Sequence, residues 1–370
     1  MNYKETLFFV AKCLTISLEE KNRLEIEIQL KTTKIDWDAV VKVSTGHYVF
    51  PALYCNLKRA HFLQYLPEDL VAYMKHITDL NRVRNEQIIQ QAKELHQLLL
   101  DHHITPIFLK GTGNLLEGLY EDIAERMVGD IDFIFSKEDY PKAIEVLTLD
   151  KYTKVVEEKY DFPQFKHYSR LHKAHRIAAV EIHKELLIEK YAQEFNYDFI
   201  ITDCQKIHEI SVMSFENQLS LSIIAKQIND DGFHFKNIAL RNAYDVFLLS
   251  KKANTKNAFS KFNTLKNPLN CFLAICYEVF GGINSLAYEE TTDTKEYINT
   301  FYLFLTNESK RKTKTNLKTK ELFIKKRMSI IYKSLFHKDY RTWVFKRISD
   351  KNWQKEKLIQ LGIKKPTPNS

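Results

Sequence analysis

Residues 129–135 read Gly-Asp-Ile-Asp-Phe-Ile-Phe, and this short stretch indicates both a strand and a concentration of negative charge. Apolar side chains alternate with its two aspartates, which is the pattern of a β-strand with one buried face. Asp130 and Asp132 therefore leave the strand on the same face, side by side. Neighbouring carboxylates repel each other unless cations neutralise them, and their hard oxygen atoms suit magnesium. We predict that Asp130 and Asp132 are metal ligands and catalytic residues.

A glycine-rich turn precedes this strand. The chain has only nine glycines, and four of them lie close together: Gly111, Gly113, Gly118 and Gly129. Such a concentration indicates unusual backbone conformations or the close approach of a ligand. Lys110, Gly111 and Thr112 follow a short apolar run and precede a helical pattern, and backbone amides at such a turn bind anions. Alone, the turn also fits an ordinary loop, but with the acidic strand after it we predict a site for nucleotide phosphates.

A third carboxylate is predicted on a second strand, residues 178–183. Glu181 alternates with apolar neighbours and so faces away from the core. Two metal ions about 3.5 to 4 Å apart need bridging and terminal oxygen atoms. We therefore predict Glu181 as the third metal ligand and as a candidate proton acceptor, against the alternative of a surface glutamate. His183 shares its face and is predicted to contact nucleotide, with ordinary packing as the alternative.

Several basic residues are candidates for phosphate binding. Arg126 lies in the loop before the acidic strand, where its guanidinium would match phosphate geometry; anchoring the loop is the alternative role. Asp245 lies in a predicted helix and is expected to pair with Arg241 one turn earlier. The basic stretch 166–176 contains three histidines but no cysteine, so it indicates a phosphate-receiving surface rather than a zinc site.

Helical patterns dominate the rest of the chain, so the predicted fold class is α+β, with a small mixed sheet flanked by large helical regions. We expect strands between about residues 104 and 185. The predicted units are an N-terminal helical domain, 1–100, a catalytic core, 101–200, and a C-terminal helical domain, 201–370. Within the last, segment 310–327 carries nine Lys or Arg and one acid, which predicts a solvated face, with RNA contact as the alternative.

The composition is that of an ordinary globular protein, with 44% hydrophobic and 28% charged residues. Because no run approaches eighteen apolar residues, we expect no membrane contact. The first fourteen residues are interpreted as a helix rather than a signal peptide. Five scattered cysteines lack metal-site spacing, and we expect reduced thiols and a cytoplasmic location.

These motifs together resemble the bacterial family of uncharacterised nucleotidyltransferases, within the DNA polymerase β-like superfamily. The resemblance extends from about Trp37 to Leu249, and the matching pieces are Phe108-Leu109-Lys110-Gly111, Leu119-Tyr120, Arg126, Gly129 to Ile134, Val180 to His183, and Leu240 to Val246. It implies a polymerase-β-like nucleotidyltransferase sheet, magnesium or manganese as cofactor, and a nucleoside triphosphate substrate such as ATP. One departure is Gly111-Thr112, where the superfamily usually has glycine and serine.

The predicted reaction moves a nucleoside monophosphate from a nucleoside triphosphate to a hydroxyl group and releases pyrophosphate. The acceptor stays open among a small molecule, a polysaccharide, a protein and RNA. An alternative is an RNA-binding or toxin-like module that acts on or binds tRNA through segment 310–327. A catalytically inactive scaffold is disfavoured because Asp130, Asp132 and Glu181 are all present.

Overall fold

The structure is a computed structural model that describes residues 1–156, 162–163 and 165–360, with side chains through residue 355. The predicted domain 201–370 ends in residues 361–370, which lie outside this description. The chain divides into two compact units, Met1–Val155 with Lys166–Arg311, and Val156–Phe165 with Lys312–Ser370. The three-domain division expected from the sequence stays a prediction.

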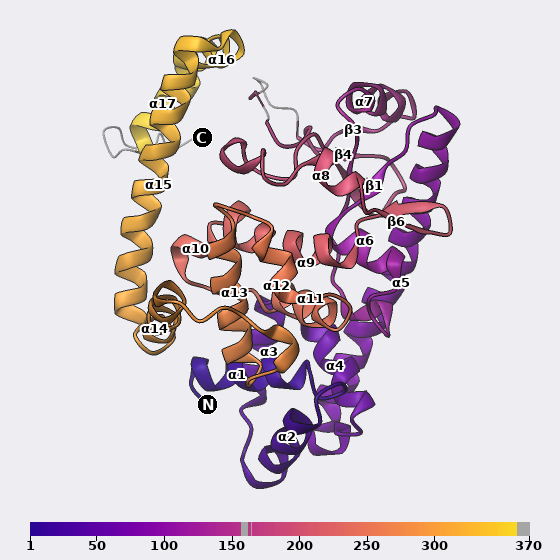
Figure 1. The fold of residues 1–370 in the computed structure, drawn as a ribbon, viewed down its shortest axis with the longest axis vertical. Coiled ribbons are helices and arrows are strands. Elements are labelled where there is room, and N and C mark those ends of the chain that lie inside the picture. The colour runs from indigo at the N-terminus through magenta and orange to yellow at the C-terminus, as the bar shows by residue number, and fades with distance from the viewer. Residues whose placement is uncertain (157–161, 164, 361–370) are drawn as a thin grey trace. The chain divides into compact units, whose positions relative to one another are not determined.

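Five helices precede the sheet in the first unit: α1 (Tyr3–Cys13), α2 (Glu20–Thr32), α3 (Trp37–Gly46), α4 (Phe50–Arg59) and α5 (Glu68–Asp101). The longest, α5, buries Ile88, Ala92, Leu95 and Leu99 along one face, at the spacing of an amphipathic helix. It runs beside the strands (Figure 1). Gln91 attaches α5 to the sheet, because its side-chain amide exchanges hydrogen bonds of 2.9 and 3.1 Å with the backbone of Ala178.

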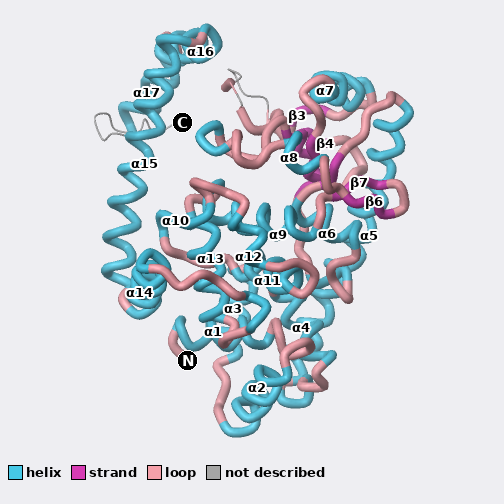
Figure 2. Tube along the Cα trace, in the orientation of Figure 1, coloured by secondary structure: helices cyan, strands magenta, loops and turns pink. Residues whose placement is uncertain are grey.

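One mixed seven-stranded sheet holds the strands β1 (Ile107–Phe108), β2 (Asp130–Ile134), β3 (Thr153–Lys154), β4 (Leu171–His172), β5 (Ala179–His183), β6 (Gln205–Ile207) and β7 (Ile210–Val212). Their order is β3-β4-β5-β2-β1-β7-β6, with β2 parallel to β5 and antiparallel to β1. Figure 2 shows the strands gathered in one small region among many helices. The predicted α+β class is confirmed.

The expectation that strands end near residue 185 is wrong, because β6 and β7 form a hairpin beyond it. Strand β7 pairs in parallel with β1, so that Phe108 lies opposite Val212. Each strand of the hairpin has only three residues, too few for alternation to be distinguished from a helical pattern. The pairing partner β1 therefore stabilises a strand that local sequence does not indicate.

Two helices follow strands of the sheet in the chain, α6 (Lys110–Glu117) after β1 and α7 (Asp139–Leu149) after β2. The remaining helices of this unit are α8 (Tyr197–Ile201), α9 (Phe215–Ile224), α10 (Gly232–Phe235), α11 (Leu240–Ser250), α12 (Thr255–Ser260), α13 (Lys266–Val279) and α14 (Thr292–Thr306). A π-helical turn, Ala225–Asn229, continues α9. One hydrophobic core extends from Leu7 in α1 through the sheet to Phe301 in α14, so the sheet and its flanking helices are buried together.

The second unit contains most of α15 (Glu308–Phe336), together with α16 (Lys338–Ile348) and α17 (Lys351–Gln360). Phe162 packs against Tyr340 and Trp343 of α16, with ring centroids 5.8 and 4.9 Å apart. Helix α15 includes the basic segment 310–327 and buries none of its side chains. In the described part of the chain, no helix combines the length and the apolar character needed to cross a bilayer.

Candidate active site

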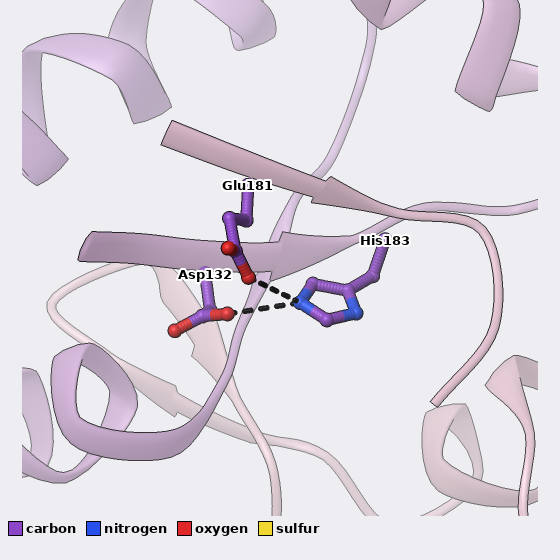
Figure 3. Close-up of side chains that lie close together, drawn as sticks. All are labelled: Asp132, Glu181 and His183. Carbon is purple, nitrogen blue, oxygen red and sulfur yellow. Dashed lines mark hydrogen bonds and ion pairs between the residues drawn. The ribbon is translucent and has the colours of Figure 1, made fainter. Parts of the chain in front are cut away.

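Strands β2 and β5 bring two of the predicted carboxylates together. In their parallel register Asp132 lies directly opposite Glu181, and Ile134 lies opposite His183. The intervening Ile131 and Phe133 are fully buried on the other face, as the alternating sequence predicts. The pairing of the two strands thus places Asp132, Glu181 and His183 on one face of the sheet, where Figure 3 shows both carboxylates directed toward the imidazole.

These three side chains form a cluster that fits a divalent metal ion. One ligand atom from each lies within 4.8 Å of the others. His183 Nε2 is 2.9 Å from Asp132 Oδ1 and 3.7 Å from Glu181 Oε2. Two carboxylates and an imidazole are ligands that divalent ions such as manganese accept, and carboxylates suit magnesium. His183, predicted as a nucleotide contact, therefore lies where a third metal ligand would be.

Asp130 stands at the start of β2 and is connected to this cluster through an arginine. Arg170 Nη2 donates to Asp130 Oδ2 at 2.5 Å and lies 3.4 Å from Glu181 Oε1. Burial raises the pKa of Asp130, against the lowering influence of Arg170. Arg170 is 47% exposed, so this ion pair lies at the solvent-facing edge of the site. A metal ion bound by both Asp130 and Glu181 would replace Arg170 between them.

Lys110 occupies the inner side of the same cluster. Its Nζ donates to Asp132 Oδ1 at 2.5 Å and lies 3.8 Å from Glu181 Oε2. Burial opposes its charge, but Asp132 and Glu181 hold the pKa of Lys110 above its usual value. Burial likewise opposes the charge of Asp132, yet Lys110 and His183 keep the pKa of Asp132 far below its usual range. Lys110 adopts a left-handed backbone conformation, with φ of 51°, which is strained for a lysine.

The turn after Lys110 is packed closely. A β-carbon at Gly111 would lie 3.0 Å from Val128 Cγ2 and 3.5 Å from the guanidinium carbon of Arg126. Thr112 is fully buried, and its hydroxyl donates to the backbone carbonyl of Asp130 at 3.0 Å. A side chain at position 111 would therefore crowd Val128 but make only ordinary contact with Arg126, and the threonine hydroxyl attaches α6 to β2. Phosphate binding by Gly111 and Thr112 stays a prediction.

Arg126 and Asp245 form a buried ion pair, 7% and 2% exposed. Arg126 donates to Asp245 Oδ2 through Nε at 3.1 Å, and Nη2 lies 3.0 Å from the same oxygen. Tyr120 donates to the other carboxylate oxygen at 2.6 Å. The expected partner of Asp245 was Arg241, and this pairing is wrong, because the loop before β2 directs Arg126 toward α11. The predicted alternative role of Arg126 as a loop anchor is consistent with this ion pair.

Two asparagines of α5 hold the backbone of that loop. Asn81 donates to the carbonyl oxygen of Ala124 at 2.7 Å, and Asn85 donates to that of Ile123 at 2.6 Å. Both side chains also donate to the carbonyl of Arg126, at 3.2 and 2.7 Å. Sequence reasoning did not identify these asparagines, whose only signal is a polar residue on the apolar face of a long helix.

Sequence reasoning also left three cationic residues out of the site. Arg170, which contacts Asp130 and Glu181, and Lys166 were noted only as parts of a basic surface. Arg241 was considered only as a partner for Asp245. The structure places Lys166 and Arg241 with Lys110 and Arg126 around a pocket of about 160 Å³ beside the acidic cluster.

Comparisons with known proteins identify the family. Residues 33–279 match the family described as "Uncharacterised nucleotidyltransferase". A similar solved structure is titled "Crystal structure of JHP933 from Helicobacter pylori"; it is 14% identical, with a TM-score of 0.31, over 65% of this chain and 97% of that chain. No curated protein matches. Because the family match covers more than half of the chain and includes both acidic strands, the chain belongs to the family of uncharacterised nucleotidyltransferases.

Proposed function

We propose that this chain transfers a nucleoside monophosphate from a nucleoside triphosphate to a hydroxyl group, with release of pyrophosphate. The observation that carries the proposal is the placement of Asp132 opposite Glu181, with His183 on the same face, inside a segment that matches a nucleotidyltransferase family. A polymerase-β-like evolutionary origin, a bacterial source, ATP as a donor and a cytoplasmic location belong to the same proposal. Free cysteines at all five positions support the location.

Asp130, Asp132 and Glu181, with His183 beside them, would hold magnesium or manganese, which supplies positive charge to the phosphates and lowers the pKa of the attacking hydroxyl. The hydroxyl oxygen attacks the α phosphorus, where the new P–O bond forms. The bond from that phosphorus to the bridging oxygen of the β phosphate breaks, and its electron pair leaves with pyrophosphate. The hydroxyl proton passes to a carboxylate, for which Glu181 is the candidate.

The surrounding residues position the donor. The ammonium group of Lys110 lies against Asp132, so it would also lie close to a phosphate bound at this carboxylate. The backbone amides of Gly111 and Thr112 lie in the first turn of α6, where amides have no partner within the helix, and would bind phosphate oxygens. Arg126 lies against Gly111 and adds positive charge, although Asp245 balances most of it.

The proposal is tested by incubating the full chain with each α-labelled nucleoside triphosphate, magnesium or manganese, and a cell extract that supplies acceptors. Wild type should label one fraction of the extract, and Asp132→Asn should abolish labelling. Asp101→Asn, an exposed aspartate at the end of α5, is the matched control and should label normally. If no nucleotide and no metal produces labelling that depends on Asp132, the proposed activity is wrong.

A second candidate function is that of an RNA-binding or toxin-like module, which acts on or binds tRNA through segment 310–327. It is favoured by the exposure of α15, which carries this basic segment without burying any side chain. Replacing Lys325, Lys326 and Arg327 with glutamine should weaken RNA binding. The salt dependence of the binding constant should then correspond to about three fewer released counterions. Unchanged RNA affinity in that variant would remove this candidate.

A further inference from the structure

The pocket beside the acidic cluster is built from four separate segments of the chain. Lys110 and Arg126 line it from the turn and the loop that flank α6, and Lys166 lines it from the segment before β4. The helical side of the pocket includes Asn229, Asp230, Arg241 and Asp245. Lys110 belongs to both the pocket and the acidic cluster, so a ligand in the pocket lies next to Asp132.

Four cationic side chains surround this pocket, but only two of them are matched by carboxylates. Lys110 pairs with Asp132, and Arg126 pairs with Asp245. Within the described residues, neither Lys166 nor Arg241 lies in ion-pair contact with any carboxylate. The other acidic residue of the lining, Asp230, is exposed. The pocket therefore carries an excess of positive charge.

Polar atoms around the pocket also lack hydrogen-bond partners. Arg241 Nε and both side-chain polar atoms of Asn229 are buried without a partner among the described residues. Burial, reinforced by Lys110, lowers the pKa of Lys166; burial and Arg126 do the same for Arg241. Tyr48 offers Arg241 only a ring face, 5.2 Å from the guanidinium carbon. Lys166 and Arg241 are half-buried, and a half-buried charge without a carboxylate partner, like a buried donor without an acceptor, is unfavourable unless a ligand satisfies it.

The charges and hydrogen-bond donors that line the pocket indicate which class of ligand it would bind. Two unmatched cations repel a metal ion and attract an anion with more than one charge. A guanidinium, an ammonium and a carboxamide together offer several donors, as phosphate oxygens require. A polyphosphate chain can contact cations on both sides of the pocket while its other end stays at the acidic cluster.

We propose that this pocket binds a polyphosphate anion, through Lys166, Arg241 and Asn229: the β and γ phosphates of the donor before transfer, and pyrophosphate after it. The inference rests on the proposed function and deepens it, because it assigns the terminal phosphates of the donor to residues outside the acidic cluster. The helical region would then take part in donor binding, because the anion contacts Arg241 of α11 and Asn229 of the π-helical turn as well as Lys166 before β4.

The test measures binding of sodium pyrophosphate and of inorganic tripolyphosphate to the full chain by calorimetry, in EDTA and at fixed ionic strength. Wild type should bind both more tightly than orthophosphate. Lys166→Gln and Arg241→Gln should each weaken pyrophosphate binding at least about tenfold, as expected for loss of a charge-assisted contact. Lys93→Gln, an exposed lysine on α5, should bind as wild type does.

Two further measurements separate phosphate binding from structural roles. Arg241→Lys should recover part of the affinity that Arg241→Gln loses, because it restores charge but not the planar guanidinium. With labelled donor, both glutamine variants should raise KM for the nucleoside triphosphate about tenfold or more while changing kcat less. Thermal melting in the absence of anion should show folded variants with no loss of stability, since each change removes an unmatched charge.

The outcomes distinguish this inference from the function on which it rests. Pyrophosphate binding that depends on Lys166 and Arg241, without any nucleotidyl transfer, would support an anion pocket and refute the proposed function. Transfer activity with wild-type KM and wild-type pyrophosphate affinity in both variants would overturn the pocket inference and leave the function intact.

Discussion

Asp130, Asp132 and Glu181 on the sheet each contact a cationic side chain, whereas Lys166 and Arg241 in the adjacent pocket contact no described carboxylate. The acidic cluster is therefore balanced by Lys110 and Arg170, and the pocket is not balanced by the protein itself. The site therefore contains charges that are paired within the protein and charges that are not. A cation that already pairs with a carboxylate gains less from a bound anion, whereas a cation without a carboxylate partner attracts an anion that supplies the missing charge.

The largest effect is expected on the acidic side. Glu181→Gln keeps the size of the side chain but removes a charge opposite Asp132, so nucleotidyl transfer should fall at least about a thousandfold, or about 4 kcal/mol. Turnover of labelled donor under saturating substrate measures this loss. Glu145→Gln, on the exposed side of α7, is the control with the same chemical change. Equal turnover in the two variants would show that the cluster does not act in catalysis.

The next largest effect concerns the buried ion pair of Arg126 and Asp245, which lines the pocket. Asp245→Asn leaves Arg126 unmatched among the other cations, and the free energy of unfolding should fall by about 3 kcal/mol. Denaturant titration measures it, and Asp230→Asn, an exposed carboxylate of the same pocket, should change stability by less than about 0.5 kcal/mol. Pyrophosphate should restore more stability to Asp245→Asn than to wild type. Similar losses in both variants would contradict the distinction between matched and unmatched charge.

A smaller effect is expected where the balancing cation is half exposed. Arg170 bridges Asp130 and Glu181 at the edge of the site, so a metal ion that binds there must displace it. Arg170→Gln should tighten manganese binding about fivefold, which corresponds to about 1 kcal/mol, because exposed ion pairs are weak. Calorimetric titration with manganese measures the change. Weaker manganese binding in the variant would show that Arg170 supports the metal site rather than competing with it.

The smallest effect concerns a carboxylate balanced by amides instead of cations. Glu117 accepts hydrogen bonds of 2.6 Å from Gln205 and Gln218, and burial raises its pKa from 4.5 to about 7. Between these two values the folded protein binds more protons than the unfolded chain, so stability falls as pH rises through this window. Because Glu117 is partly exposed, the loss between pH 5 and pH 8 should not exceed about 1 kcal/mol. Glu117→Gln should flatten the profile, and an equal slope in that variant would assign the pH dependence to other groups.

The acidic strands were predictable because their information is local. Alternation over a few residues sets which side chains share a face, and it predicts Asp130, Asp132 and Glu181 on strands. The long helix α5 was predictable for the same reason, since its apolar period repeats over many turns. The hairpin β6–β7 was not, because three-residue strands depend on a partner rather than on their own pattern.

The candidate carboxylates, the glycine turn and the α+β class could be predicted from the amino-acid sequence, because short-range periodicity and composition indicate each of them. The contacts between charged side chains depend on the folded chain. Arg126 and Asp245 are 119 positions apart, and His183 joins the carboxylates only because β5 pairs in parallel with β2. No local sequence pattern identifies the distant partner of a charged side chain. The ion pairs of the acidic cluster and the unpaired cations of the pocket are therefore visible only in the folded chain.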